Sequence, residues 1–97
     1  MENTRTIEEI RAERVKVGKA QAAALRKAYR CDVRLSELSE ELGEAAGGDT
    51  EAVGRTAGEI TEELGKVSRA RNNAARKLIR CRDRLLELDE EERRCAG

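Results

Sequence analysis

Residues 34–41 of the chain read RLSELSEE and residues 84–91 read RLLELDEE, with six identical positions in eight. The match extends outward from this octapeptide. Sliding residues 1–47 along the chain by 50 positions, without a gap, pairs 21 identical residues. An internal repeat of this kind constrains the architecture before any single residue is considered. We therefore expect two copies of one structural unit, repeat 1 at about residues 5–47 and repeat 2 at about residues 55–97.

Apolar or small residues recur in each copy at alternating steps of three and four. A period of 3.5 residues sustained over about five heptads is the signature of a left-handed coiled coil. Each copy therefore predicts one long helix. The seam residues are Ile7, Ile10, Val17, Ala24, Ala28, Cys31, Leu35, Leu38 and Leu42 in the first copy, and Ala57, Ile60, Leu64, Val67, Ala74, Leu78, Cys81, Leu85 and Leu88 in the second. Arg14, Gln21 and Arg71 interrupt this pattern with polar side chains.

Start signals for the helices are duplicated as well. Thr6 with Glu9, and Thr56 with Glu59, have the Thr-x-x-Glu spacing of a capping box. In this motif each side chain bonds the backbone amide of the other residue. Both copies therefore carry a helix N-terminus at the same place in the repeat.

Gly43 follows the last seam residue of the first copy and is expected to end its helix. We predict a first helix over about 6–42, a connector at 43–49 and a second helix over about 50–93. Ninety-seven residues make one small domain, so residues 1–97 are expected to form a single helical hairpin.

A short connector makes two long helices antiparallel neighbours, so the predicted fold class is all-α, an antiparallel coiled-coil hairpin with internal pseudo-twofold symmetry. Pairing like heptad positions sets the register. The predicted layers join Ile10 with Leu88, Val17 with Cys81, Ala24 with Ala74, Cys31 with Val67 and Leu38 with Ile60. An alternative is that Gly18 and Gly65 break each copy in two and give a compact four-helix bundle.

The middle of the seam is mostly alanine, around Ala24 opposite Ala74, and alanine burial contributes little stability. A small isolated hairpin of this composition is only marginally stable. A second apolar stripe follows the outside of the first helix, and we predict that two hairpins pair through it as a homodimeric four-helix bundle. The predicted interface residues are Val15, Ala22, Leu25, Tyr29, Val33 and Ile79. The alternative is that they are scattered surface apolar groups, which single chains tolerate.

Charge is balanced overall, with 20 basic and 20 acidic residues, but it is divided into blocks. Residues 11–34 carry a net charge of +6 and residues 66–84 one of +7, so the hairpin has a basic waist between acidic ends. One interpretation is contact with a nucleic-acid backbone. The candidate residues are Arg26, Lys27, Arg30, Arg69, Arg76, Lys77 and Arg80. Zero net charge and the lack of stacking aromatic residues favour the other interpretation, in which these charges solvate exposed helix faces.

No residue pattern indicates a cofactor or a catalytic centre. The chain has no histidine, and Cys31 and Cys81 occupy seam positions that suit small buried side chains. The amino-terminal residues are charged and no apolar stretch is long enough to span a membrane, so we expect a cytoplasmic protein.

One group of carboxylates has a spacing of its own. Its members are Glu40, Glu41 and Glu44, followed by Glu59 and Glu62 or by Glu63 and Lys66. The arrangement resembles the Glu-Glu-x-x-Glu and Glu-x-x-Asp motifs of MazG-type nucleotide pyrophosphohydrolases. That resemblance implies an all-α, magnesium-dependent hydrolase of nucleoside triphosphates. It covers about 25 residues, and it departs from the motif where Glu62 replaces the aspartate or Lys66 takes its place.

The leading functional hypothesis is therefore a non-enzymatic helical interaction protein, acting as a homo-oligomeric scaffold, adaptor or inhibitor. Nucleic-acid backbone binding through the basic waist is the second hypothesis, and the MazG-like hydrolase is the third.

Overall fold

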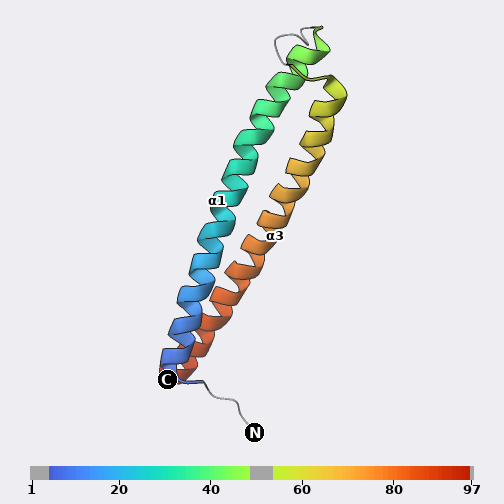
Figure 1. Ribbon diagram of the computed structural model, residues 1–97. Coiled ribbons are helices and arrows are strands. Elements are labelled where there is room, and N and C mark those ends of the chain that lie inside the picture. The colour runs from blue at the N-terminus through green and yellow to red at the C-terminus, as the bar shows by residue number, and fades with distance from the viewer. Residues whose placement is uncertain (1–4, 49–53, 97) are drawn as a thin grey trace.

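The computed structural model describes residues 5–48 and 54–96. Within these ranges it contains two helices, α1 (Ile7–Ala46) and α3 (Ala57–Ala96), each 40 residues long. They lie antiparallel and side by side (Figure 1), and the molecule measures 67 × 20 × 14 Å. The prediction of an all-α hairpin of two long helices is confirmed.

Both helices are continuous through their interior glycines, Gly18 and Gly65. The alternative of a compact four-helix bundle within one chain is therefore wrong. A glycine inside a helix costs only about 1 kcal/mol relative to alanine, which the seam contacts on either side offset. A Cβ atom built on Gly18 would meet nothing within 4 Å, so this glycine is not required by close packing within the hairpin.

Both predicted capping boxes are present. The backbone N–H of Glu9 donates to Thr6 Oγ1 at 3.2 Å, and the backbone N–H of Thr6 donates to Glu9 Oε1 at 3.0 Å. Glu59 and Thr56 make the same two bonds, at 3.2 and 3.1 Å respectively. Each helix therefore begins one residue after its threonine, and the two starts are 50 positions apart.

The predicted end of the first helix, at about residue 42, is wrong. Helix α1 passes through Gly43 and ends at Ala46, where the N–H of Gly47 donates to the carbonyl of Gly43 at 3.1 Å. The physical reason is Ala45, which continues the seven-residue seam spacing and is buried. Gly48, with φ of 92°, then adopts the left-handed conformation that ends the helix.

The predicted start of the second helix, at about residue 50, is also wrong. Gly54 has φ of 75°, which a right-handed helix does not allow, and α3 begins at Ala57 after its capping box. The helix then runs to Ala96, three residues beyond the predicted end. The predicted connector 43–49 therefore lies mostly within α1, and residues 49–53 lie outside the described residues.

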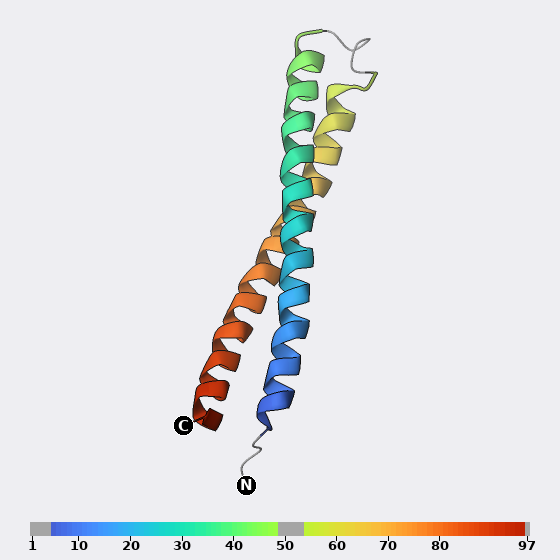
Figure 2. The same cartoon turned by 90° about the vertical axis from the view of Figure 1, so that its left-hand side faces the viewer.

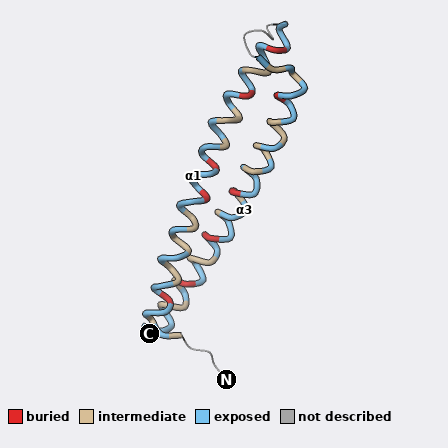
Figure 3. The backbone as a smooth tube through the Cα atoms, viewed as in Figure 1, coloured by how far each residue is buried: buried red, intermediate tan, exposed pale blue. Residues whose placement is uncertain are grey.

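The buried residues form a line along the facing sides of α1 and α3 (Figure 3). The largest fully buried side chains among them are Ile10, Leu38, Ile60 and Leu88. Leu38 and Ile60 pack in one cluster with Ala45, as the predicted register requires. The helices cross near their middles (Figure 2), where the seam is built from alanine. A close approach at the crossing follows from those small side chains.

Two of the three polar residues that interrupt the heptad pattern, Arg14 and Arg71, form ion pairs between the helices. Arg14 contacts Asp89 at 2.5 Å and Glu92 at 2.6 Å, and Arg71 contacts Asp32 at 2.9 Å. These arginines therefore lie beside the seam, where their charged ends reach the opposite helix.

Candidate functional site

Two clusters of arginine and glutamate join the helices, one toward each end of the hairpin. In the first, the guanidinium of Arg84 donates to both carboxylate oxygens of Glu13, from Nε at 2.6 Å and from Nη2 at 2.9 Å. Arg5 donates to the same carboxylate of Glu13 and, at 2.6 Å, to Glu91. One glutamate thus accepts from two arginines of different segments, which fixes the register locally.

The second cluster repeats these contacts at the positions 50 residues along. Arg34 donates to both oxygens of Glu63, from Nε at 2.9 Å and from Nη2 at 3.2 Å. Arg55 donates to Glu63 and, at 2.7 Å, to Glu41. The sequence reasoning missed both clusters because they lie beside the seam, but all four of their residue pairs are identical between the copies.

These contacts lower the pKa of the shared glutamates. Hydrogen bonds from Arg84 and then from Arg5 lower the pKa of Glu13 to about 2. Hydrogen bonds from Arg34 and then from Arg55 lower the pKa of Glu63 to about 2. Both carboxylates therefore stay ionised at any pH near neutral.

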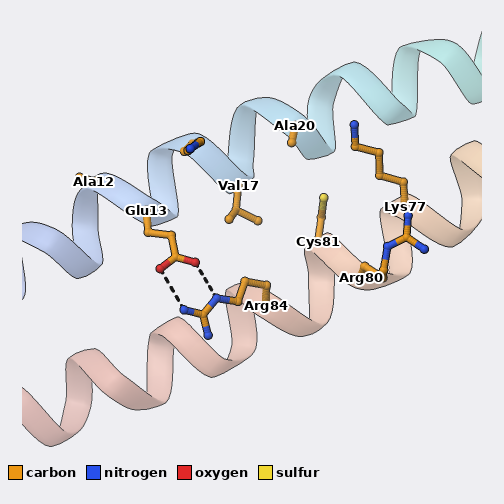
Figure 4. Close-up of a pocket in the computed structure, with 9 residues that line it drawn as sticks. Ala12, Glu13, Val17, Ala20, Lys77, Arg80, Cys81 and Arg84 are labelled. Atoms are coloured by element: carbon orange, nitrogen blue, oxygen red, sulfur yellow. Dashed lines mark hydrogen bonds and ion pairs between the residues drawn. The ribbon is translucent and has the colours of Figure 1, made fainter. Parts of the chain in front are cut away.

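A groove opens between the helices next to the first cluster (Figure 4). Val17 of α1 and Cys81 of α3 point toward each other across its floor, beside Ala20. Its rim is basic. The residues that line this groove, apart from Ala12 and Glu13 at its end, are Lys16, Val17, Ala20, Lys77, Arg80, Cys81 and Arg84.

A second groove lies next to the other cluster and is lined by the same residue types. Its lining is Lys66, Val67, Ala70, Lys27, Arg30, Cys31 and Arg34. Each of these seven residues is identical to the one 50 positions away in the first groove, whereas 21 of 47 positions match over the repeat as a whole. The duplication is therefore complete for these seven residue pairs and partial elsewhere.

A shallow depression at the crossing joins the two grooves. Its floor is formed by Ala23, Ala24, Asn73 and Ala74, and its rim by side chains that also line the grooves. Those shared side chains are Lys27 and Arg30 on α1 and Lys77 and Arg80 on α3. The three hollows therefore make one continuous groove, which we call the basic groove.

Six cations of the basic groove form no ion pair with a carboxylate of residues 5–48 or 54–96. Among the described residues, Arg34 and Arg84 are held by the clusters, and the other rim cations form no ion pair. The rim cations that form no ion pair with the described residues are Lys16, Lys27, Arg30, Lys66, Lys77 and Arg80. The rim therefore presents positive charge that the hairpin itself does not neutralise.

The seven candidate nucleic-acid contacts divide into two sets. Lys27, Arg30, Lys77 and Arg80 come together around the central depression. The remaining three, Arg26, Arg69 and Arg76, are exposed but line none of these hollows. Lys16 and Lys66 join the first set although the sequence reasoning did not select them.

The predicted interface residues are exposed. Leu25 and Tyr29, one helical turn apart on α1, keep 60% and 64% of their surface accessible. Val15, Ala22 and Val33 are exposed along the same helix. We call these five residues of α1 the outer stripe. On α3, Ile79 is exposed, and so is Leu86, which was not among the predicted interface residues.

The outer stripe and the basic groove lie on different sides of α1. At about 100° per residue, the outer stripe lies about 100–180° from the buried Ala24 in one sense, and Lys27 and Arg30 lie about 60° and 120° from it in the other. The two surfaces therefore leave room for separate partners.

Two of the carboxylates with the MazG-like spacing bind arginine. Glu41 accepts from Arg55, and Glu63 accepts from Arg34 and Arg55. Within residues 5–48 and 54–96, no group of three or more histidine, cysteine, aspartate or glutamate side chains is placed to hold a metal ion. Cys31, Cys81 and Cys95 are free thiols, of which Cys81 is buried.

Comparison of the chain with protein-family models, with curated proteins and with solved structures found no match. In the part of the chain that the structure describes, neither helix carries a stretch apolar enough to cross a membrane.

Proposed function

We propose that the protein is a non-enzymatic helical interaction module that self-associates through the outer stripe of α1, two hairpins forming a four-helix dimer in which the two α1 helices pack on each other. The observation that carries this proposal is the exposure of Leu25 and Tyr29, at 60% and 64%. Burying a side chain of this size contributes about 1.5–3 kcal/mol, so two adjacent ones are costly to leave in water.

Association would stabilise the hairpin, because its own core contains few large apolar side chains. Its middle is closed by Ala24 and Ala74, and its large buried side chains lie toward the two ends. Covering the outer stripe adds apolar burial at the level of Leu25 and Tyr29, where the seam itself supplies least.

An antiparallel pairing of two α1 helices gives the outer stripe a self-complementary shape. If Leu25 of both copies meets at the twofold axis, Tyr29 of one copy packs on Ala22 of the other. Val33 then faces Gly18, whose Cα is open to the surroundings. Large side chains thus meet small ones, as an isologous interface requires.

The test is the mass in solution of the double variant Leu25→Glu/Tyr29→Glu, measured by light scattering on a sizing column. We expect the parent to have twice the 10.8 kDa of one chain and the variant to have the mass of one. The control variant Thr61→Glu/Asn72→Glu adds the same charge to exposed positions of α3 and should keep the parent mass. An unchanged mass in Leu25→Glu/Tyr29→Glu would refute the proposal.

A further inference from the structure

The basic groove has the dimensions of a helix-binding site. From Lys16 to Arg34 it follows α1 for 18 residues, which at 1.5 Å per residue is about 27 Å. Its floor between the two helices consists of small side chains, chiefly alanine with Val17 and Val67. Small floor residues allow a third helix to approach closely, because interaxial distance depends on the side chains at the contact.

The rim determines the charge of the occupant. Six lysine and arginine side chains without an ion pair among the described residues surround the floor. Glu13 lines one end of the groove, Glu63 shares a hollow with Lys66 at the other, and each already binds two arginines. The charge of the rim is therefore left for an anionic partner.

The floor of the groove determines which apolar groups the occupant must carry. Val17 and Cys81 face each other across one groove, and Val67 and Cys31 line the other. A phosphate backbone would contact the rim but gain nothing from this apolar floor. The single aromatic residue, Tyr29, lies outside the groove, so no stacking platform for bases is present in it. A ligand that matches both floor and rim is apolar along one side and acidic along its flanks.

We propose that the basic groove binds an acidic amphipathic helix of a partner protein, laid lengthwise between α1 and α3. This is the helix-in-groove mode of recognition, with apolar anchors on the floor and carboxylates on the rim. The site is separate from the outer stripe and does not depend on self-association. Because seven lining residues of each groove are identical at positions 50 apart, a helix meets the same side chains whichever way it points, except at Ala23 and Asn73 in the central depression.

The probe is a fluorescent peptide of about 20 residues, long enough to fill the groove as a helix, with leucine along one face and glutamate on the flanks. Its reversed sequence, a scrambled peptide of the same composition and a generic DNA duplex are compared by fluorescence anisotropy. We expect the peptide and its reverse to bind with affinities within about threefold of each other, and the scrambled peptide to bind at least about tenfold more weakly.

Two matched variants of the protein locate the binding site. Lys27→Glu/Lys77→Glu reverses charge on the groove rim and should weaken peptide binding by about tenfold or more. Arg26→Glu/Arg76→Glu makes the same change in charge one residue away, outside the groove lining, and should weaken binding by less than about threefold. Circular dichroism of each variant establishes that both retain the helical hairpin.

Several outcomes would overturn the proposal. Absence of peptide binding, or equal binding of the scrambled peptide, would exclude an amphipathic ligand. Tighter binding of the DNA duplex, weakened equally by both variants, would assign the rim to phosphate. A fall in the mass of Lys27→Glu/Lys77→Glu would mean that a second copy of this chain fills the groove. Because the sites are separate, Leu25→Glu/Tyr29→Glu should bind the peptide like the parent, whether or not it is monomeric.

Discussion

The basic groove and the outer stripe relate to the internal repeat in opposite ways. Every residue of the second groove is identical to its counterpart in the first. By contrast, each large exposed apolar residue has a different counterpart, as in the replacement of Tyr29 by Ile79 and of Val33 by Asp83. The seven lining residues therefore repeat at both ends of the hairpin, whereas Ile79 is the one large exposed apolar residue among the equivalent positions of α3.

The restriction of the outer stripe to α1 limits how copies of the hairpin can assemble. A hairpin with an adhesive stripe on one helix forms a closed pair about a twofold axis. A stripe on both helices would give each chain two adhesive edges and allow an open series of contacts. In α3 the stripe positions equivalent to Val15 and Ala22 are Gly65 and Asn72, which offer little apolar surface. The asymmetry of the stripe thus limits the assembly, while the groove remains available on each copy.

Copying the stripe onto α3 should have the largest effect. The variant Gly65→Val/Asn72→Ala/Ala75→Leu/Ile79→Tyr/Asp83→Val gives both helices the same outer residues. We expect assemblies heavier than a dimer whose mass rises with concentration, because each chain gains a second adhesive edge. Analytical ultracentrifugation over a range of concentrations measures this. A variant that remained the size of the parent would contradict the role given to the asymmetry.

The next largest effect is expected on the free energy of unfolding, and it differs between two leucines of α3. Leu88 is fully buried and Leu86, two residues earlier, is 56% exposed. Leu88→Ala should lower the free energy of unfolding by about 2–5 kcal/mol through lost burial and a cavity. Leu86→Ala should change it by less than about 0.5 kcal/mol, because the outer side of α3 has no partner in our account. Urea unfolding followed by circular dichroism measures both. A large loss in Leu86→Ala would show that α3 is also covered.

A smaller effect is expected from acid, and it tests the equivalence of the two groove ends. Glu13 and Glu63 have a pKa of about 2 in the folded protein, against about 4.3 for an unfolded chain. Between these values the unfolded state binds more protons, so the free energy of unfolding falls as the pH is lowered from about 4.3 towards about 2. Thermal unfolding as a function of pH measures the loss.

Single variants separate the two ends. Glu13→Gln and Glu63→Gln should each remove part of this acid dependence, and by the same amount, because their arginine contacts are equivalent. Unequal losses would mean that the two clusters differ in solution. A double variant with the acid dependence of the parent would exclude these glutamates as its cause.

The sequence was sufficient for the fold because one periodic signal dominates it. The heptad spacing predicts two long helices, and pairing of like positions predicts layers such as Leu38 with Ile60. The ends of the helices were harder to predict from the sequence. Gly43 is a residue type that often ends helices. Burial of Ala45, one turn beyond the predicted end, outweighs the cost of a glycine inside a helix, which is about 1 kcal/mol.

The grooves were harder to predict, because they depend on which side of the seam each charge faces. Arg26 and Lys27 are adjacent and both basic in the two copies, yet only Lys27 lines the groove. A signal was present in the repeat itself. Identical residues that serve neither the seam nor the caps include Glu13, Lys16 and Arg30, and these lie in the clusters and grooves.

We expect the outer stripe to bind a second copy of the chain and the basic groove to bind a peptide, each independently of the other. Sedimentation equilibrium of the parent with saturating acidic peptide tests it most directly, since it gives the number of each molecule in the complex. We expect two chains with a peptide in each groove. A complex of one chain with one peptide, or a dimer that excludes the peptide, would contradict it.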